Sequence, residues 1–197
     1  MGSEMPDQVA KEFCFVANGI HGLYLDTASA IGNLAASCID HHKKYLDQAN
    51  ASGQPAAARD APNPIVVYTT QAGGEARPVH QTTLVDLIKR NQPSGRNMQR
   101  LGQMCVVALY QYWEDEFRPR LANALGRKPA DLKHDTFGEL RHLRRSVLHR
   151  NGRAVAECAQ AKTLPRYTPG SDILLDRAAM DRIVSAVRQA AHEVAES

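Results

Sequence analysis

The sequence contains no run of 18 apolar residues, the length that a transmembrane helix needs, and no secretory signal peptide. It has no C-x-x-C pair, and its four cysteines (Cys14, Cys38, Cys105 and Cys158) are far apart. This spacing argues against a zinc site and against a disulfide framework. There are no internal repeats and no low-complexity segments. We therefore expect a cytoplasmic protein without a membrane span, a metal or a cofactor.

Neither sign of charge dominates the chain. Its 24 lysines and arginines and its 21 aspartates and glutamates give a formal net charge of +3 at pH 7. Hydrophobic residues make up 43% and charged residues 23%, which are the proportions of an ordinary globular protein. A chain of 197 residues is long enough for one domain with its own core and too short for two large ones. We expect residues 1–197 to form a single helical domain.

The first predicted element is a long helix from about Pro6 to near Ala51. Apolar residues recur along it at spacings of three and four, or seven and eight: Val9, Phe13, Val16, Ile20, Leu23, Ile31, Leu34 and Cys38. This period places them on one buried seam. Gly19, Gly22 and Gly32 each cost about 1 kcal/mol relative to alanine in a helix. They indicate either close packing of a second helix or a kink, and we favour close packing.

The helical pattern stops after the first helix. Residues 51–64 are rich in Ala, Pro and Gly, PIVVYTT is typical of a short strand, and QAGGEARPVH is a turn that allows a second strand. We expect a small β-hairpin or loop insertion at about 52–81. Thr82 or Thr83 is placed to cap the short helix LVDLIKRN that follows.

Three further helices complete the prediction. A second long helix, ending at Gly126, has this buried face: Met98, Leu101, Cys105, Leu109, Tyr112, Phe117 and Leu121. The last helix starts after Asp176 and buries five residues: Met180, Ile183, Val184, Val187 and Val194. Between them lies a helix that begins near Thr136. We therefore expect an all-α bundle of about five helices, with two long antiparallel helices and the hairpin or loop insertion.

The helix near Thr136 carries the densest charge of the chain. Thr136 and Glu139 form the T-x-x-E of a capping box. Within residues 141–153 there are five arginines, two histidines and no acidic residue: Arg141, His142, Arg144, Arg145, His149, Arg150 and Arg153. Asn151 and Gly152 tolerate the left-handed conformation that ends a helix. Because Leu140, Leu143 and Val147 supply an apolar stripe, the cationic remainder is expected to face solvent.

Four residues separate Arg144 from His149 in LRRSVLHRNG. This spacing resembles the Arg-x4–6-His signature of the HEPN superfamily of helical ribonucleases. ALYQYWEDEFRPRLANALG is similar to the aromatic-acidic helix that precedes the motif helix in that family, and PGSDILLDRAAMDRIV to its turn into a last helix. The resemblance covers about residues 98–194. It implies a metal-independent endoribonuclease in which Arg144 and His149 are catalytic and come together from the two subunits of a symmetric homodimer.

The chemistry of these residues agrees with that activity. Imidazole titrates near neutral pH, so His149 can take a proton from a ribose 2′-hydroxyl. The guanidinium of Arg144 can stabilise the charge that develops on the phosphate. The neighbouring polar residues are expected to bind the RNA backbone: Arg141, Arg145, Arg150, Asn151 and Arg153. RNA is thus the expected substrate.

Helical geometry favours a composite site. Five positions along a helix are about 500° of rotation, so Arg144 and His149 point about 140° apart. Arg145 and His149, at i and i+4, share a face, but the family pattern selects Arg144. The position of Arg145 is commonly a small polar residue in the family, and an arginine there cannot accept a hydrogen bond from His149. We expect the first helix to supply the apolar dimer surface.

Two classes of function remain open. The first is a ribonuclease that acts as a toxin or an antiviral, abortive-infection type effector, held in check by an antitoxin or a regulatory protein. The second is a non-catalytic helical module that binds nucleic acid or a protein through the same basic helix. In the second case His149 is a helix-end histidine stabilised by the helix dipole.

Overall fold

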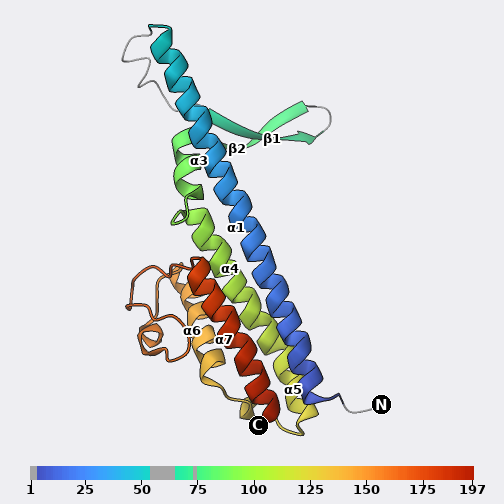
Figure 1. Cartoon of the computed structure of the whole chain (residues 1–197). Coiled ribbons are helices and arrows are strands. Elements are labelled where there is room, and N and C mark those ends of the chain that lie inside the picture. The colour runs from blue at the N-terminus through green and yellow to red at the C-terminus, as the bar shows by residue number, and fades with distance from the viewer. Residues whose placement is uncertain (1–3, 54–64, 73–74) are drawn as a thin grey trace. The chain divides into compact units, whose positions relative to one another are not determined.

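The computed structural model describes residues 4–53, 65–72 and 75–197, with only the backbone described for the strand residues up to 79. Its contacts form two compact units, Met1–Thr27 with Gln99–Ser197 (unit 1) and Ala28–Met98 (unit 2) (Figure 1). From the sequence we expected one helical domain with a hairpin or loop insertion at about 52–81. The second unit is larger than that insertion, because it also includes the end of the first helix and the start of the second long one.

Helix α1 runs from Pro6 to Ala51 without interruption, as predicted. Its inward positions in unit 1 are occupied by Val9 and Phe13, each 1% exposed. The expected close packing at the helix glycines is wrong. A Cβ atom on Gly19, Gly22 or Gly32 would meet no atom of the described residues within 4 Å.

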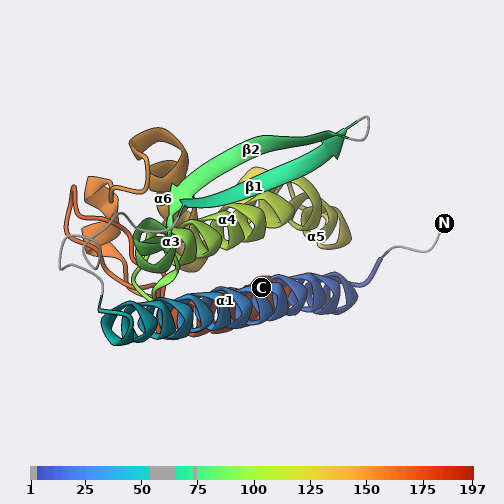
Figure 2. The ribbon, with the colours of Figure 1, turned by 90° about the horizontal axis from the view of Figure 1, so that it is seen from above.

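Unit 2 contains the predicted hairpin. Strand β1 (Ile65–Ala72) pairs antiparallel with β2 (Glu75–Thr83), in a register that runs from Ile65 opposite Thr83 to Ala72 opposite Glu75 (Figure 2). The part of the predicted loop at 54–64 lies outside the described residues. Thr83 caps helix α3 (Leu84–Asn91), since its hydroxyl accepts a hydrogen bond from the Asp86 N–H at 3.1 Å.

The second long helix has three segments. Helix α4 (Arg96–Tyr112) continues as a π-helical turn, η1 (Trp113–Phe117), and then as α5 (Arg118–Ala124). In unit 1, α4 runs antiparallel to the first half of α1 (Figure 1). The predicted buried positions are correct for Cys105, Leu109, Phe117 and Leu121, whereas Tyr112 is 44% exposed.

Helix α6 (Asp135–Arg150) carries the arginine-rich segment, but its predicted capping box is wrong. The Nδ1 atom of His134 caps the helix by accepting from the Thr136 N–H at 3.2 Å. The Glu139 carboxylate instead accepts hydrogen bonds from the N–H groups of Lys162 and Leu164, at 2.6 and 2.8 Å. These bonds provide acceptors for backbone N–H groups of the loop at residues 162–164. They also tie α6 to that loop.

Helix α7 (Arg177–Glu196) begins after Asp176, whose carboxylate accepts from the Ala179 N–H at 2.8 Å. All five of its predicted core residues are buried: Met180, Ile183, Val184, Val187 and Val194. The core of unit 1 also contains an aromatic cluster, in which the rings of Trp113 and Phe137 stack with centroids 3.5 Å apart. Phe13 of α1 joins this cluster, with its ring centroid 6.0 Å from that of Phe137.

The fold is the expected all-α bundle with a small hairpin. Two short 3-10 turns, η2 (Pro129–Asp131) and η3 (Ala156–Gln160), connect its helices. Within the described ranges, no helix combines the length and the apolar character that crossing a bilayer requires.

Candidate functional site

The end of α6 is fixed by its left-handed residues. Asn151 has φ +53° and Gly152 has φ +83°, and the N–H groups of both bond to the carbonyl oxygen of Ser146. This helix end agrees with the prediction from Asn151 and Gly152 in the sequence. A Cβ atom on Gly152 would clash with the side chain of Gln103, which is 5% exposed. Glycine is therefore required here both by the backbone conformation and by the close approach of α4.

Ser146 joins α6 to the chain that follows it. Its side chain is fully buried, and its hydroxyl donates to the His142 carbonyl at 2.8 Å. The same hydroxyl accepts from the Val155 N–H at 3.0 Å. Because a buried N–H without a partner is costly, this bond holds residues 153–157 against the last turns of the helix.

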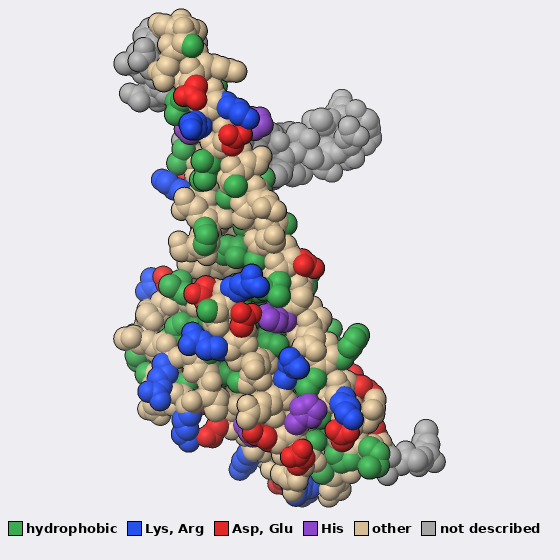
Figure 3. Space-filling view, viewed as in Figure 1, with side chains coloured by type: hydrophobic (Ala, Val, Ile, Leu, Met, Phe, Trp, Pro, Cys, Tyr) green, Lys and Arg blue, Asp and Glu red, His purple; other side chains and the backbone are tan. Residues whose placement is uncertain are grey.

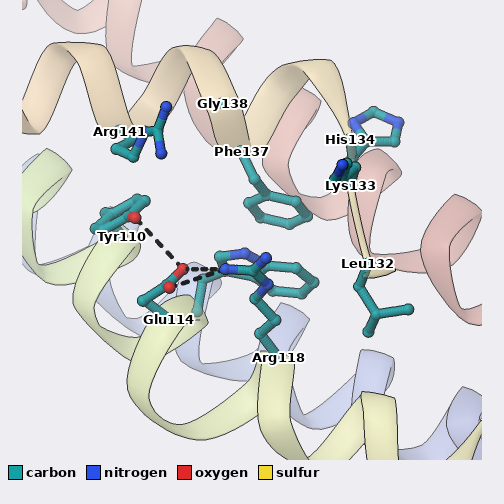
Figure 4. Close-up of a pocket in the computed structure, with 10 residues that line it drawn as sticks. Tyr110, Glu114, Arg118, Leu132, Lys133, His134, Phe137, Gly138 and Arg141 are labelled. Atoms are coloured by element: carbon teal, nitrogen blue, oxygen red, sulfur yellow. Dashed lines mark hydrogen bonds and ion pairs between the residues drawn. The ribbon is translucent and has the colours of Figure 1, made fainter. Parts of the chain in front are cut away.

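Arg144, the predicted catalytic arginine, packs against α4. Its guanidinium carbon lies 5.5 Å from the centre of the Tyr110 ring, which is a cation–π contact. The Tyr110 hydroxyl donates to Glu114 at 3.3 Å, and Glu114 in turn accepts two bonds from Arg118, at 2.8 and 2.9 Å (Figure 4). The Nε atom of Arg144 is buried, and no described residue accepts its hydrogen. Arg144 is thus held in place by packing on α4.

Arg141 lies on the same side of α6. It lines a hollow of about 290 Å³ with Tyr110, Glu114 and Arg118 (Figure 4). Two of the three acidic residues of η1 form ion pairs with arginines of α5, Glu114 with Arg118 at 2.8 Å and Glu116 with Arg120 at 3.2 Å, whereas Asp115 accepts a hydrogen bond from the side chain of Gln111.

His149, the predicted catalytic histidine, is exposed near the end of α6, and no described residue makes a hydrogen bond with its side chain. Helix α6 is regular through Arg150. The two side chains, five positions apart, therefore diverge by about 140° within one chain. One copy of the protein does not bring Arg144 and His149 to a common point.

The structure does bring three of the predicted RNA-binding residues together. Arg145, Arg150 and Arg153 line one hollow of about 460 Å³, which is completed by residues 154–157 and Gly170. We call it the α6 hollow. It lies at the exit of α6, the end where the helix also carries His149.

The arginines of the α6 hollow differ in their partners. Arg145 donates two bonds of 2.7 Å to the carboxylate of Glu157. The pKa of Glu157 is lowered by a hydrogen bond from its own backbone N–H and by the Arg145 guanidinium. Arg150 and Arg153 have no ion pair with any described residue. Three guanidinium groups and one carboxylate leave the lining with a net charge of +2.

Asn151, also predicted to bind RNA, has a different partner. Its side-chain oxygen accepts from Arg100 of α4 at 2.6 Å, and Arg100 also donates to Gln103 at 3.1 Å. Arg100 and Glu157 were not predicted from the sequence. Arg100 lies 51 residues from its partner and Glu157 lies in a 3-10 turn, so neither belongs to the periodic pattern of α6.

His142 is a third residue that sequence reasoning left without a role. It is half-buried, and no described residue bonds to its buried Nδ1 atom. Burial lowers the pKa of His142, and the nearby Arg141 and Arg145 lower it further against the opposing effect of Glu157. His142 is therefore biased toward its neutral form.

Over other helices of the protein the charged side chains are of both signs (Figure 3). On the face of the molecule shown in Figure 3, acidic and basic side chains are intermixed over α1 and α7. The arginine cluster is consequently a local feature, in keeping with the small net charge of +3. In the part of the chain that the structure describes, no group of three or more His, Cys, Asp or Glu residues is arranged to hold a metal ion.

Comparisons with protein-family models, with curated proteins and with solved structures found no match to this chain. The arguments for its function therefore come from its own residues and their geometry.

Proposed function

We propose that the protein is a metal-independent endoribonuclease of the HEPN type. The observation that carries the proposal is the α6 hollow, in which three arginines gather beside the end of α6 that carries the exposed His149. The Arg-x4-His spacing of Arg144 and His149 supports the assignment to this family. A role as a toxin or an antiviral effector follows from the same resemblance.

Binding comes first in the proposed mechanism. Arg150 and Arg153 have no ion pair with a described residue, so each can form charge-assisted hydrogen bonds to phosphate oxygens without first breaking one. Neutralising phosphates releases the counterions of the RNA, which makes the affinity fall as the salt concentration rises. Arg145 takes part only to the extent that it leaves Glu157.

Cleavage follows by transfer of the phosphoryl group within the RNA. His149 takes the proton of a ribose 2′-hydroxyl, and the 2′-oxygen attacks the adjacent phosphorus. The bond from phosphorus to the 5′-oxygen breaks, and the leaving oxygen takes a proton from water, while the protonated His149 returns its proton to solvent. The products are a 2′,3′-cyclic phosphate and a 5′-hydroxyl end. The guanidinium of Arg144 stabilises the negative charge on the phosphoryl oxygens. No redox step or co-reactant is needed.

The divergence of Arg144 and His149 calls for a second copy of the chain. The first helix, on which we expected the dimer surface, is not suited to this role. Phe13 on its inner face reaches Phe137 of α6, whereas Phe15 on its opposite face is 80% exposed. Pairing through the Phe15 face would place the two α6 helices on the outside of the dimer.

A surface beside α6 is better placed. Contacts of Arg100 with Asn151 and of Tyr110 with Arg144 show that α4 and α6 run side by side there. Two exposed apolar side chains lie on these stretches, Met104 at 69% and Leu148 at 49% exposure. We assign the two-fold contact to this α4–α6 face, which adjoins Arg144.

The test is an RNA-cleavage assay in EDTA with mixed subunits. Arg144→Ala and His149→Ala are each expected to be inactive alone. In a mixture, half of the dimers contain both variants and one of their two sites is intact, so about a quarter of wild-type activity returns. Inactivity of the wild type in EDTA, with recovery in magnesium or manganese, would contradict the proposal. A mixture that stays inactive rejects the composite site.

A second candidate is a non-catalytic module that binds nucleic acid. It is favoured by the partners of two arginines of α6, since Arg144 packs on Tyr110 and Arg145 pairs with Glu157. Both then have structural roles. This candidate predicts RNA binding that depends on Arg150 and Arg153, with no cleavage under any condition, and the same assay distinguishes the two.

A further inference from the structure

A second cationic hollow lies in unit 2, at the corner between α3 and α4. Its volume is about 600 Å³, and its lining includes Lys89 and Arg90 at the end of α3 and Arg96 at the start of α4. His80 and Asp86 also line it. All of these residues belong to unit 2, so the hollow is complete within that unit. We call it the corner hollow.

The corner that forms this hollow is tightly built. Asn91 is 2% exposed and accepts a hydrogen bond of 2.6 Å from the side chain of Asn97. The Gly95 N–H donates to the Gln92 carbonyl at 2.7 Å. A Cβ atom on Gly95 would clash with the carbonyl group of Arg90, so the turn needs glycine for this close approach. These contacts bring the cations of two helices to one place before any ligand binds.

Among the described residues of the lining, Asp86 supplies the one carboxylate, and it is engaged elsewhere. Asp86 accepts a hydrogen bond of 2.8 Å from the hydroxyl of Thr83, and its own N–H bonds to that hydroxyl as part of the α3 cap. Lys89 and Arg96 are exposed and form no ion pair with a described residue. The corner hollow therefore presents cationic groups that are not neutralised by a carboxylate in contact with them.

Arg90 is held toward the hollow by His80. Its Nη1 atom lies 3.0 Å from His80 Nε2, and because a guanidinium only donates, the imidazole nitrogen accepts. The Nε atom of Arg90 is buried, and no described residue accepts its hydrogen.

We propose that the corner hollow binds a phosphate group. A phosphate presents several anionic oxygens, which suits guanidinium and ammonium donors that converge from two helices. The source of the phosphate is either the backbone of an RNA strand or a free nucleotide. The RNA source rests on the proposed function, whereas the phosphate chemistry rests on the corner hollow alone.

The test measures binding in a His149→Ala background, so that RNA stays intact. Lys89→Ala with Arg96→Ala is compared with Lys43→Ala and Lys44→Ala, a control that removes the same charge from exposed positions of α1 in the same unit. The probes are a fluorescent single-stranded RNA of ten nucleotides, adenosine monophosphate and inorganic phosphate. The fold of each variant is checked by its circular dichroism and melting temperature.

We expect the Lys89/Arg96 variant to bind the RNA roughly tenfold more weakly, with a salt dependence reduced by about 1.4 in log–log slope for two lost phosphate contacts. The Lys43/Lys44 control should keep the wild-type slope. If only the nucleotide and inorganic phosphate lose binding, the ligand is a free phosphate compound. If the Lys89/Arg96 variant and the control bind all three probes alike, the proposal is overturned.

A parallel variant separates this proposal from the function of the α6 hollow. If the variant with Arg150→Ala and Arg153→Ala loses RNA binding and the Lys89/Arg96 variant does not, only the proposed phosphate site in the corner hollow is rejected. If the Lys89/Arg96 variant loses RNA but the wild-type protein cuts no RNA, the proposed ribonuclease fails and the corner site stands.

Discussion

The α6 hollow and the corner hollow contain the same kinds of groups in different arrangements. Among the residues that the structure describes, each has three cationic side chains, one carboxylate and a histidine on or near its lining. In the α6 hollow the carboxylate of Glu157 pairs with Arg145, and the imidazole of His149 has no described partner. In the corner hollow the Asp86 carboxylate accepts a hydrogen bond from Thr83, the residue that caps α3, and His80 contacts Arg90. The two hollows therefore differ in what engages their carboxylate and their histidine, and under the proposed function only the α6 hollow has an imidazole available to act as a base.

The largest effect should separate the two histidines. His149→Ala removes the proposed general base and is expected to lower the rate of RNA cleavage by about a hundredfold or more. His80→Ala leaves the base in place and should stay within a few-fold of the wild type. Single-turnover cleavage of a labelled RNA in EDTA measures both. An active His149→Ala protein, or an inactive but folded His80→Ala protein, would reverse the assignment.

The next effect is on the framework of the α6 hollow. Ser146→Ala leaves the N–H of Val155 buried without its acceptor, which should cost about 1–3 kcal/mol of unfolding free energy. Ser185→Ala, at an exposed position of α7, is the matched control and should be nearly neutral. Urea denaturation measures both. An equal, small change in the two variants would mean that the Ser146 hydroxyl does not hold residues 153–157.

RNA binding should distinguish the paired arginine from the unpaired ones. Arg150→Ala with Arg153→Ala removes two free guanidinium groups and is expected to weaken RNA binding roughly tenfold, with a flatter salt dependence. Arg145→Ala removes a group that already bonds to Glu157, so its effect should be smaller. Fluorescence anisotropy at several salt concentrations gives both values. A larger loss for Arg145→Ala would show that the Glu157 pair opens when RNA binds.

Neutralising Glu157 should leave the cations of the α6 hollow without an ion pair to a described residue, as the cations of the corner hollow are. Glu157→Gln removes the negative charge beside Arg145, and we expect RNA affinity to rise a few-fold with a steeper salt dependence. Glu196→Gln, at an exposed position of α7, controls for the change in net charge. Weaker binding of Glu157→Gln than of this control would mean that the ion pair positions Arg145 for the phosphate.

The smallest effect is on the stability of the fold at acidic pH. Burial raises the pKa of Glu139, but hydrogen bonds from Lys162, Thr163 and Leu164 lower it more, so the net pKa lies below its usual value of 4.5. A lowered folded-state pKa gives stability that is present above the unfolded pKa and lost as the pH falls through the folded one. The corner of the corner hollow is held by a hydrogen bond between the side-chain amides of Asn91 and Asn97, which do not titrate.

We therefore expect unit 1 to lose stability below about pH 4.5 through this residue, with less loss in Glu139→Gln, which starts from a lower stability at pH 7. The denaturation midpoints of the wild type and of Glu139→Gln are measured at several pH values between 3 and 7. Parallel pH curves for the wild type and Glu139→Gln would show that the carboxylate contributes nothing to the acid response.

Periodicity and capping were sufficient for much of the fold. The bounds of α1, the hairpin and the caps at Thr83 and Asp176 depend on neighbours within a few residues, which a sequence displays directly. The capping box failed because Glu139 bonds to residues 23 to 25 positions away. Local patterns contain no information about such partners. The π-helical turn at Trp113–Phe117 has no periodic signal either.

The sequence indicated which residues of the candidate site lie near one another, but not the contacts that they make. The sequence placed the arginines and His149 on one helix, and the regular α6 keeps the predicted divergence of Arg144 and His149. It did not reveal that Arg145 would pair with Glu157, or that Arg144 would lie over Tyr110. Both contacts depend on how separate segments pack, which no spacing within α6 encodes.

The stack of Trp113 on Phe137 gives the protein an optical reporter of its own. Trp113 is the one tryptophan of the chain, it is 2% exposed, and its ring lies parallel to a ring of α6 at 3.5 Å. Its emission therefore depends on whether α6 is docked against η1. Displacement of α6 would admit water to the indole and shift the fluorescence to longer wavelength, so movement of that helix can be followed in real time without a label.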